Sequence, residues 1–290
     1  LGVMISRVTG GPYWDFLRER VFDPAGMPTI RINTATEIVP NRARGYMPGP
    51  GGLQNASHVA EQTNTTADGS MLFSLRDMVA WNEVVRIRDV LSPGSWDQIT
   101  TPLVLNSGNS HPYGFAWFFD EVAGQPVLEH SGSWQGFVNQ YTRFPDQDLS
   151  VIVLTNARTA MSAPLAMRVG AMIDPVLAPE PPPTEAIADD PAVTAYIADM
   201  LAKMADGSIE LTDFDFIRQT VFPRMRAALR AQLGTLGRPD DLTLLAREQV
   251  GDDTEFVYRG TWGDQRRRIT LSIGPDGGLT NFVFITPDSP

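Results

Sequence analysis

The stretch PVLEHSGSWQGFVNQYTRFPDQDLSVIVLT, residues 126–155, decides the fold predicted for this chain. Together with the residues just before it, it contains four short apolar or alternating runs that are typical of strands. These runs lie at Gly114–Asp120, Pro126–Glu129, Phe137–Phe144 and Leu149–Thr155. The connectors Ala123–Gln125 and Pro145–Asp148 are rich in turn-forming residues. We therefore predict an antiparallel meander in which consecutive strands pair.

Helical patterns surround this meander. Amphipathic runs predict helices before and after it, and Pro93 suits the first position of a short one. The expected helices start at Pro12, cover about 70–88, follow Ser92, and cover about 160–177. Residues 28–66 show no clear period, which is usual for a functional segment or one ordered by contacts elsewhere. The predicted fold class is α+β, with an antiparallel sheet flanked by helices.

A proline-rich segment marks the end of this first part. Four prolines within Pro179–Pro183 cannot continue a helix and favour an extended segment. We interpret 179–189 as a linker, and the alternative is a rigid surface loop inside one domain. Beyond it, helices (about 190–205 and 213–234) precede strands (about 242–250, 254–262, 266–273 and 279–285). The predicted domains are therefore 1–178 and a small α+β unit at 190–290.

The composition excludes several function classes. The chain has no cysteine, so it has no disulfide, thiol nucleophile or cysteine-bound zinc. A net charge of −11 opposes nucleic-acid binding. The histidines, His58, His111 and His130, lie far apart, so we expect no metal and no cofactor. No apolar run approaches the length of a membrane-spanning helix.

The segment LEHSGSWQGF, residues 128–137, carries the residues best suited to chemistry. A strand there delivers His130 and then small residues, and Gly132 allows a ligand or another backbone to approach closely. A strand edge with a free N–H can donate to a developing oxyanion, and a histidine can move a proton. A lone histidine on a strand can equally be a structural hydrogen-bonding residue.

Six segments in order over residues 1–178 resemble the β-lactamase-related, penicillin-recognising serine hydrolases, which include class C β-lactamases, D-peptidases and carboxylesterases. Arg44-Gly45-Tyr46 resembles their A-x-G-Y step, and His130-Ser131-Gly132 takes the place of K-T-G or H-x-G. The other four segments are 10–27 (GGPYWDFLRERVFDPAGM), 67–78, 113–117 (YGFAW) and 154–156 (LTN). The resemblance implies a β-lactamase/transpeptidase-like fold and an acyl-enzyme reaction.

The chain departs from the family at its catalytic lysine. The family uses S-x-x-K, with the lysine one helical turn after the serine, and a second motif, Y-x-N or S-x-N. The only lysine here is Lys203, three residues after Met200, so S-x-x-K is absent. Either the chain is a degenerate relative, or it lacks an N-terminal part. We expect the second, with both motifs encoded upstream of Leu1 and this chain inactive alone. The alternative is a non-catalytic binding or scaffold protein of the same fold.

The resemblance implies a role for each matched residue. His130 would help to position the reacting groups, and the backbone N–H of Ser133 would donate to the oxyanion. Ser131, Gly132, Tyr46 and Trp134 would contact substrate, although the two aromatic residues could simply be packing residues. Because histidine replaces a permanently charged lysine, we expect esters, amides or D-peptides rather than dedicated β-lactam hydrolysis.

Residues 190–290 loosely resemble the small cystatin-like domains appended to some of these hydrolases. We expect a spacer, lid or dimerisation module, so a homo-oligomer could form through it. The cell compartment is unknown from the sequence, and the family resemblance favours a periplasmic or secreted protein.

Overall fold

The computed structural model describes every residue except 35, 58–66, 68, 70, 282–283 and 288–290. His58 therefore lies outside the described residues, as do Asp68 and Ser70 of the matched segment 67–78. The chain forms two compact units. The first contains Leu1–Pro102 and Tyr113–Glu180, and the second contains Leu103–Pro112 and Pro181–Pro290. The segment Leu103–Pro112 lies within the predicted domain 1–178 but groups with the second unit.

The first unit is built on a five-stranded sheet in the order β11-β10-β9-β8-β7, with every pair antiparallel. The strands are β7 (Tyr113–Gly114), β8 (Trp117–Val122), β9 (Gln125–Trp134), β10 (Phe137–Phe144) and β11 (Leu149–Thr155). The predicted meander is confirmed, because each strand pairs with its neighbour in sequence, but the first predicted strand, Gly114–Asp120, is divided by a turn at 115–116 into β7 and β8. The third and fourth predicted strands match β10 and β11. The second is longer than predicted, because β9 continues past Glu129 to Trp134 as the partner of β10.

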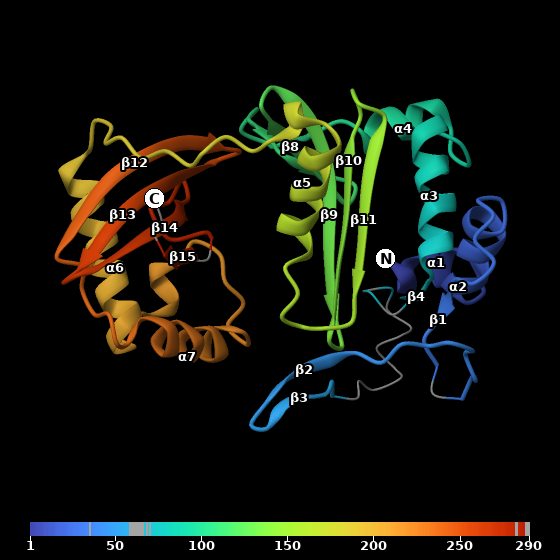
Figure 1. Cartoon of the computed structure of the whole chain (residues 1–290), viewed down its shortest axis with the longest axis horizontal. Coiled ribbons are helices and arrows are strands. Elements are labelled where there is room, and N and C mark those ends of the chain that lie inside the picture. The colour runs from blue at the N-terminus through green and yellow to red at the C-terminus, as the bar shows by residue number, and fades with distance from the viewer. Residues whose placement is uncertain (35, 58–66, 68, 70, 282–283, 288–290) are drawn as a thin grey trace. The chain divides into compact units, whose positions relative to one another are not determined.

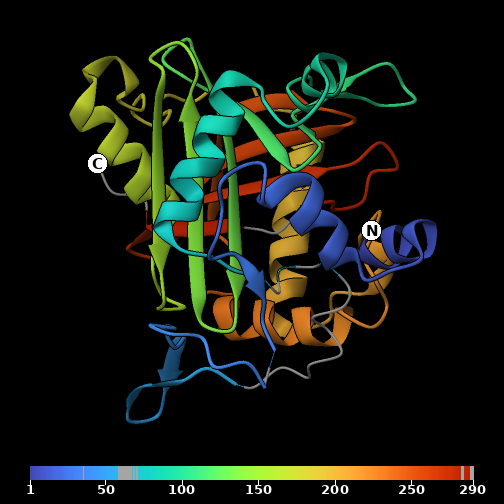
Figure 2. The same cartoon turned by 90° about the vertical axis from the view of Figure 1, so that its right-hand side faces the viewer.

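Helices cover both faces of this sheet (Figures 1 and 2). On one face, α5 (Ser162–Ile173) and the short 3-10 turn η3 (Pro175–Leu177) pack on Val127 and Val151. On the other, α3 (Leu75–Ile87) and α4 (Pro93–Ile99) pack against Trp117 and Tyr141. Side chains of a strand alternate between faces, so each strand contributes to both apolar clusters.

The N-terminal segment forms α1 (Gly2–Thr9) and then α2 (Tyr13–Leu17), which continues directly into the π-helical turn η1 (Arg18–Phe22) and matches the helix expected from Pro12. Gly10 ends α1 in the left-handed conformation that suits glycine. Phe22, Met27 and Ile30 form a small buried cluster below these turns. Short strands complete the unit and pair as β1–β4 and β2–β3. Their bounds are β1 (Arg31–Ile32), β2 (Tyr46–Gly49), β3 (Gly52–Asn55) and β4 (Met71–Leu72).

The second unit places helices on one antiparallel sheet with the order β12-β13-β14-β15. Its elements are α6 (Pro191–Asp206), the 3-10 turn η4 (Leu211–Asp213), α7 (Phe222–Leu233), β12 (Asp241–Val250), β13 (Asp253–Trp262), β14 (Gln265–Ile273) and β15 (Phe284–Pro287). The expected helix 213–234 begins only at Phe222. The core joins α6 and α7 to the sheet and includes Ile197, Leu229 and Tyr258.

Two further segments are fixed onto the second unit. The hairpin of β5 (Leu103–Val104) and β6 (Ser110–His111) is held by Asp252, which accepts hydrogen bonds from Ser107 Oγ at 2.5 Å and Asn109 Nδ2 at 2.8 Å. The proline-rich segment is anchored because the Ile187 N–H donates to Leu244 O at 3.0 Å. The expected linker is therefore partly bound to this unit.

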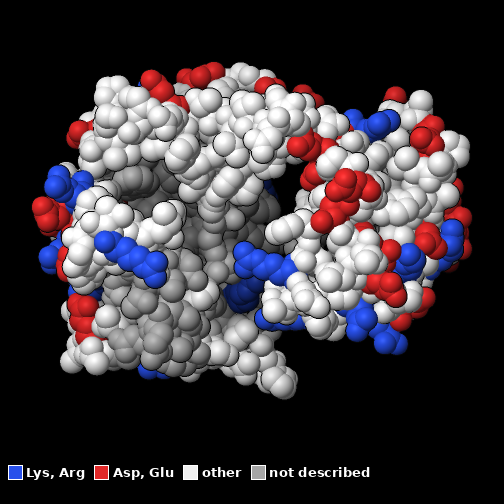
Figure 3. All heavy atoms as spheres, turned by 180° about the vertical axis from the view of Figure 1, so that it is seen from behind, with Lys and Arg blue, Asp and Glu red and all other residues white. Residues whose placement is uncertain are grey.

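The surface carries both signs of charge. Figure 3 shows both basic and acidic side chains on one face. No helix among the described residues is long and apolar enough to cross a membrane.

Candidate functional site

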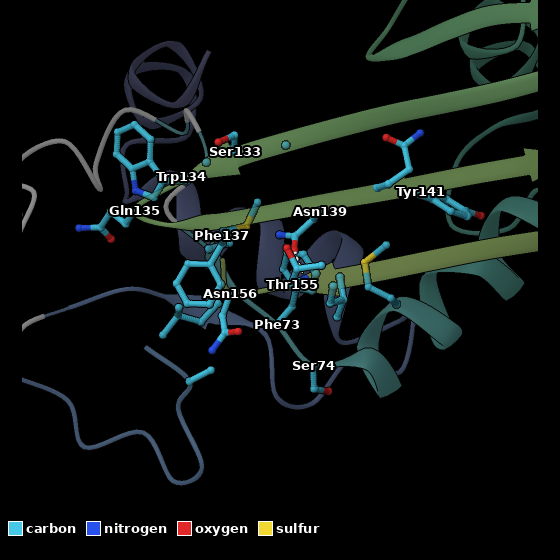
Figure 4. A pocket seen from close by; sticks show the side chains of 18 of the residues that line it. Phe73, Ser74, Ser133, Trp134, Gln135, Phe137, Asn139, Tyr141, Thr155 and Asn156 are labelled. Atoms are coloured by element: carbon cyan, nitrogen blue, oxygen red, sulfur yellow. Dashed lines mark hydrogen bonds between the residues drawn. The ribbon is translucent and has the colours of Figure 1, made fainter. Parts of the chain in front are cut away.

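A cavity of about 780 Å³ lies in the first unit, on the α3 side of the sheet. Its wall combines the ends of β9, β10 and β11 with β4 and the start of α3. Figure 4 shows Ser133 and Trp134 from β9, Phe137 and Asn139 from β10, and Ser74 near α3. The cavity therefore brings together segments that are far apart in the sequence.

The turn at the tip of β9 and β10 is held by a close backbone crossing. Gln135 and Gly136 both have positive φ, 46° and 85°, as a two-residue type I′ hairpin turn requires. A Cβ on Gly136 would lie 2.5 Å from the Tyr46 nitrogen, and one on Gly45 would lie 1.8 Å from the Gln135 oxygen. Both glycines are therefore required where the segment before β2 crosses this turn.

The same turn determines the direction of the Ser133 N–H. In a two-residue hairpin the pair that flanks the turn, here Trp134 and Phe137, is hydrogen-bonded. Further along the strands, hydrogen-bonded and non-hydrogen-bonded pairs alternate. Ser133 opposite Val138 is consequently a non-hydrogen-bonded pair, and its N–H points away from β10. The Val138 carbonyl also points away, since it accepts from Thr155 Oγ1. Among the described residues, β8 pairs with β9 only as far as Glu129, so the edge beyond is open.

His130 lines the cavity and has two hydrogen-bond partners. Its Nδ1 lies 2.7 Å from the carbonyl oxygen of Ser131, and its Nε2 lies 3.1 Å from the Tyr113 hydroxyl. The Phe118 ring stacks on the imidazole, with centroids 5.5 Å apart and planes inclined by 29°. In the sequence, Tyr113 is only part of the matched YGFAW segment, and its contact with His130 appears only in the folded chain.

The other predicted residues differ in their placement. Ser131, Gly132 and Trp134 line the cavity beside His130 and Ser133. A Cβ on Gly132 would meet no described atom within 4 Å, so the space above it is open to a ligand. Tyr46 is not among the described lining residues. Its main chain pairs with the end of β11, donating to Asn156 O at 2.8 Å and accepting from Arg158 N at 2.9 Å.

Several lining residues were not predicted as site residues. Asn139 accepts from the Thr155 N–H at 3.2 Å, the bond drawn in Figure 4, which joins β10 to the end of β11. Tyr141 donates to Asn82 Oδ1 at 2.7 Å. Burial raises the pKa of Tyr141 to about 12, so its hydroxyl stays protonated near neutral pH. Its place in the strand alternation was visible in the sequence, but its facing partner on α3 was not.

The α3 wall is fixed by a buried carboxylate. Ser74 and Asp77 form a capping box, in which the Asp77 N–H donates to Ser74 Oγ and the Ser74 N–H donates to Asp77 Oδ2 at 2.7 Å. The Thr29 N–H also donates to Asp77, at 3.1 Å, as does its hydroxyl. Burial would raise the pKa of Asp77, but the hydrogen bonds from Thr29 and Ser74 outweigh it and lower that pKa.

The turn that presents Tyr113 contains two residues in the left-handed conformation. Phe115 and Ala116, between β7 and β8, have φ of 46° and 67°, and glycine adopts this conformation without penalty. We predict that Ala116→Gly raises the free energy of unfolding by about 0.5–1 kcal/mol, because relief of strain exceeds the added chain entropy. Urea unfolding measures this. Ala123, with φ of 50° in the β8–β9 turn, offers the parallel substitution. A destabilised Ala116→Gly variant would contradict the prediction.

The comparisons identify the family of this chain. The family model described as Beta-lactamase matches residues 1–170, more than half of the sequence. The chain belongs to the beta-lactamase family. The resemblance inferred from the sequence motifs is thereby confirmed. Within this family member, the cavity, His130 and the open edge of β9 all lie in the matched region.

Related proteins match the same part of this beta-lactamase family chain. A penicillin-binding protein of Bacillus subtilis is 26% identical over 168 residues, 54% of this chain and 37% of its own length. A D-aminopeptidase of Brucella canis is 27% identical over 163 residues, 54% of this chain and 30% of its own. The chain thus spans about a third of the length of these curated relatives.

A solved structure is similar over nearly the whole chain. The octameric penicillin-binding protein homologue from Pyrococcus abyssi has a TM-score of 0.52 and 15% identity, covering 98% of this chain and 62% of that one. This likeness supports the fold of the beta-lactamase family member described here.

Lys203, the only lysine, lies on α6 of the second unit. Its ammonium donates to Asp213 at 3.0 Å and is 3.7 Å from Asp199. The hydrogen bond to Asp213 raises the pKa of Lys203, so it stays charged and is unsuited to accept a proton. In the described part of the chain, no group of three or more histidine or acidic side chains is arranged to hold a metal ion.

Proposed function

We propose that this chain provides the sheet side of an acyl-transfer site in a serine hydrolase that acts on esters, amides or D-peptide and β-lactam-type substrates. The observation that carries the proposal is the open edge of β9, where the Ser133 N–H points away from β10. A fixed backbone N–H beside a cavity is the donor that a tetrahedral oxyanion needs. Ser133 is the proposed donor, and the nucleophile's own N–H would be the second.

The neighbouring residues take the remaining roles in this proposal. His130 positions the reacting groups, and its hydrogen bonds with Tyr113 and Ser131 hold the ring in place. Gly132 leaves room for the substrate backbone along β9, because nothing described lies within 4 Å of where its side chain would begin. Ser131 and Trp134 line the same wall. Tyr46 supports the wall through its main chain.

The proposed substrate class follows from the charge at the site. Histidine at position 130 replaces the family's lysine, so this position on β9 carries no permanent positive charge for a substrate carboxylate, and the cation among the described lining residues is Arg42. This favours amides and esters of D-amino acids over substrates that must carry a carboxylate. The relatives named D-aminopeptidase support the same class.

The nucleophilic serine of this proposal is not among these residues. S-x-x-K does not occur in the sequence, and the only lysine is held charged by Asp213. The absence of S-x-x-K also favours a second candidate function, that of a non-catalytic binding or scaffold protein. In either case we expect the 290-residue chain not to react with a fluorophosphonate probe. We also propose that several copies of the chain assemble through residues 190–290.

Ligand binding by the isolated chain tests the site directly. In two-dimensional NMR spectra of the ¹⁵N-labelled chain, D-phenylalaninamide is expected to shift the amide signals of Ser131–Gln135 more than L-phenylalaninamide does. Gly132→Val fills the open space above β9 and should abolish these shifts while the other signals stay in place. Equal shifts with both enantiomers would refute the proposal, and covalent fluorophosphonate labelling would refute the expectation that this chain lacks the nucleophile.

A further inference from the structure

We propose that Tyr113 is a positioning residue that holds His130 in its Nδ1–H tautomer, with Nε2 occupied by the Tyr113 hydroxyl. The inference concerns the detailed operation of the proposed hydrolase site and rests on that function for its catalytic meaning. The geometry itself depends only on the hydrogen bonds around the imidazole.

The tautomer follows from the partner of Nδ1. The Ser131 carbonyl oxygen, 2.7 Å from Nδ1, can only accept a hydrogen bond, so Nδ1 must carry the proton. In the neutral ring, Nε2 then has a free lone pair. The Tyr113 hydroxyl, 3.1 Å away, is both a donor and an acceptor and donates to that lone pair. Both ring nitrogens are thus satisfied at once.

The Ser131 carbonyl is available because of the strand register. Ser131 lies opposite Gln140, two residues from the non-hydrogen-bonded pair Ser133 and Val138, so it occupies the same kind of position. Its carbonyl points to the open edge of β9, where it meets the imidazole of the preceding residue. The edge that presents the Ser133 N–H therefore also fixes one nitrogen of His130.

Tyr113 is in turn well placed to fix the other nitrogen. It lies in β7 directly opposite Phe118 of β8, and their rings are 4.6 Å apart. Phe118 also stacks on His130, so the three rings form one cluster at the sheet edge. The imidazole plane is held by stacking, and its rotation is fixed by hydrogen bonds at both nitrogens. Packing alone would require only a phenyl ring at position 113, whereas the hydroxyl is specific to the hydrogen bond.

The histidine tautomer can be measured in the chain as it stands. With ¹⁵N-histidine labelling, two-bond ¹⁵N–¹H spectra at pH 9 report which ring nitrogen of each neutral histidine carries hydrogen. The chain has three histidines, and His130→Gln assigns the signals of interest. We expect a protonated Nδ1 and an unprotonated, hydrogen-bonded Nε2 for His130. A protonated Nε2 in the unsubstituted chain overturns the proposal without any variant.

Three variants separate the hydroxyl from the ring. Tyr113→Phe should move the His130 Nε2 signal to that of an unbonded nitrogen, and Phe118→Leu, which keeps the hydroxyl, should leave it hydrogen-bonded. Tyr196→Phe in the second unit is the matched control and should change nothing at His130. Unchanged His130 signals in Tyr113→Phe would overturn the proposal. If the unsubstituted chain has the expected His130 tautomer but does not bind D-phenylalaninamide, the result would count against the proposed function alone.

Discussion

Gly136→Ala is expected to lower the free energy of unfolding of the first unit by about 3 kcal/mol. Two effects add. The residue has φ of 85°, where alanine is strained, and its Cβ would lie 2.5 Å from the Tyr46 nitrogen and 2.7 Å from the Gly45 carbonyl carbon. These contacts are backbone atoms, so no side chain can rotate away. Hydrogen exchange of first-unit peptides measures the loss, which should be greatest at the β9–β10 turn.

Gly132→Ala is the matched control for that substitution. It places the same methyl group in the same strand pair, where no described atom lies within 4 Å and φ is not positive. We expect its stability to stay within about 0.5 kcal/mol of the unsubstituted chain. If Gly136→Ala and Gly132→Ala destabilised the chain equally, the close contact of residues 45–46 with the β9–β10 turn would not explain the cost of Gly136→Ala.

Asp77→Ala is expected to cost about 3 kcal/mol, because it removes the N-cap partner of α3 and leaves the Thr29 and Ser74 N–H groups without their acceptor. Thermal unfolding and hydrogen exchange of α3 measure this loss. Asp97→Asn removes an exposed ion pair with Arg88 and serves as the control, with an effect below about 1 kcal/mol.

The effect of Asp77 should also depend on pH. Its pKa is lower in the folded chain than the ordinary value of 3.8, so the folded state favours the carboxylate. The stabilisation is therefore fully present above about pH 4–5 and is lost as the pH falls through the folded pKa. Asp77→Asn should accordingly differ from the unsubstituted chain at pH 7 and approach it at pH 3. A difference that stays constant between these pH values would contradict this explanation.

Local patterns predicted much of the sheet. The runs at Phe137–Phe144 and Leu149–Thr155 match β10 and β11, because strands whose two faces are both covered by helices are recognisable as short apolar stretches between turn residues. The end of β9 was missed. Ser131, Gly132 and Ser133 lack strand propensity, and they are extended because they pair with β10.

Contacts between segments far apart in the sequence explain where the structure differs from the predictions made from local patterns. The hairpin Leu103–Pro112 groups with the second unit through Asp252, which follows it by more than a hundred residues, so no local pattern could place it there. The helix expected from Pro12 is present as α2 and ends in the π-helical turn η1, where Phe22 packs into the cluster with Met27 and Ile30. For the hairpin, contacts between distant segments outweighed local propensity.

The sequence by itself determined the family and the order of the sheet strands, because motif order and strand patterns are local and survive without coordinates. It also determined that S-x-x-K is absent and that Lys203 is the only lysine. Only the tertiary structure decided which way the Ser133 N–H points, that Gly45 and Gly136 must cross, and that Tyr113 and Ser131 hold both nitrogens of His130. Those features depend on strand register and on contacts between distant segments, which no single stretch of sequence specifies.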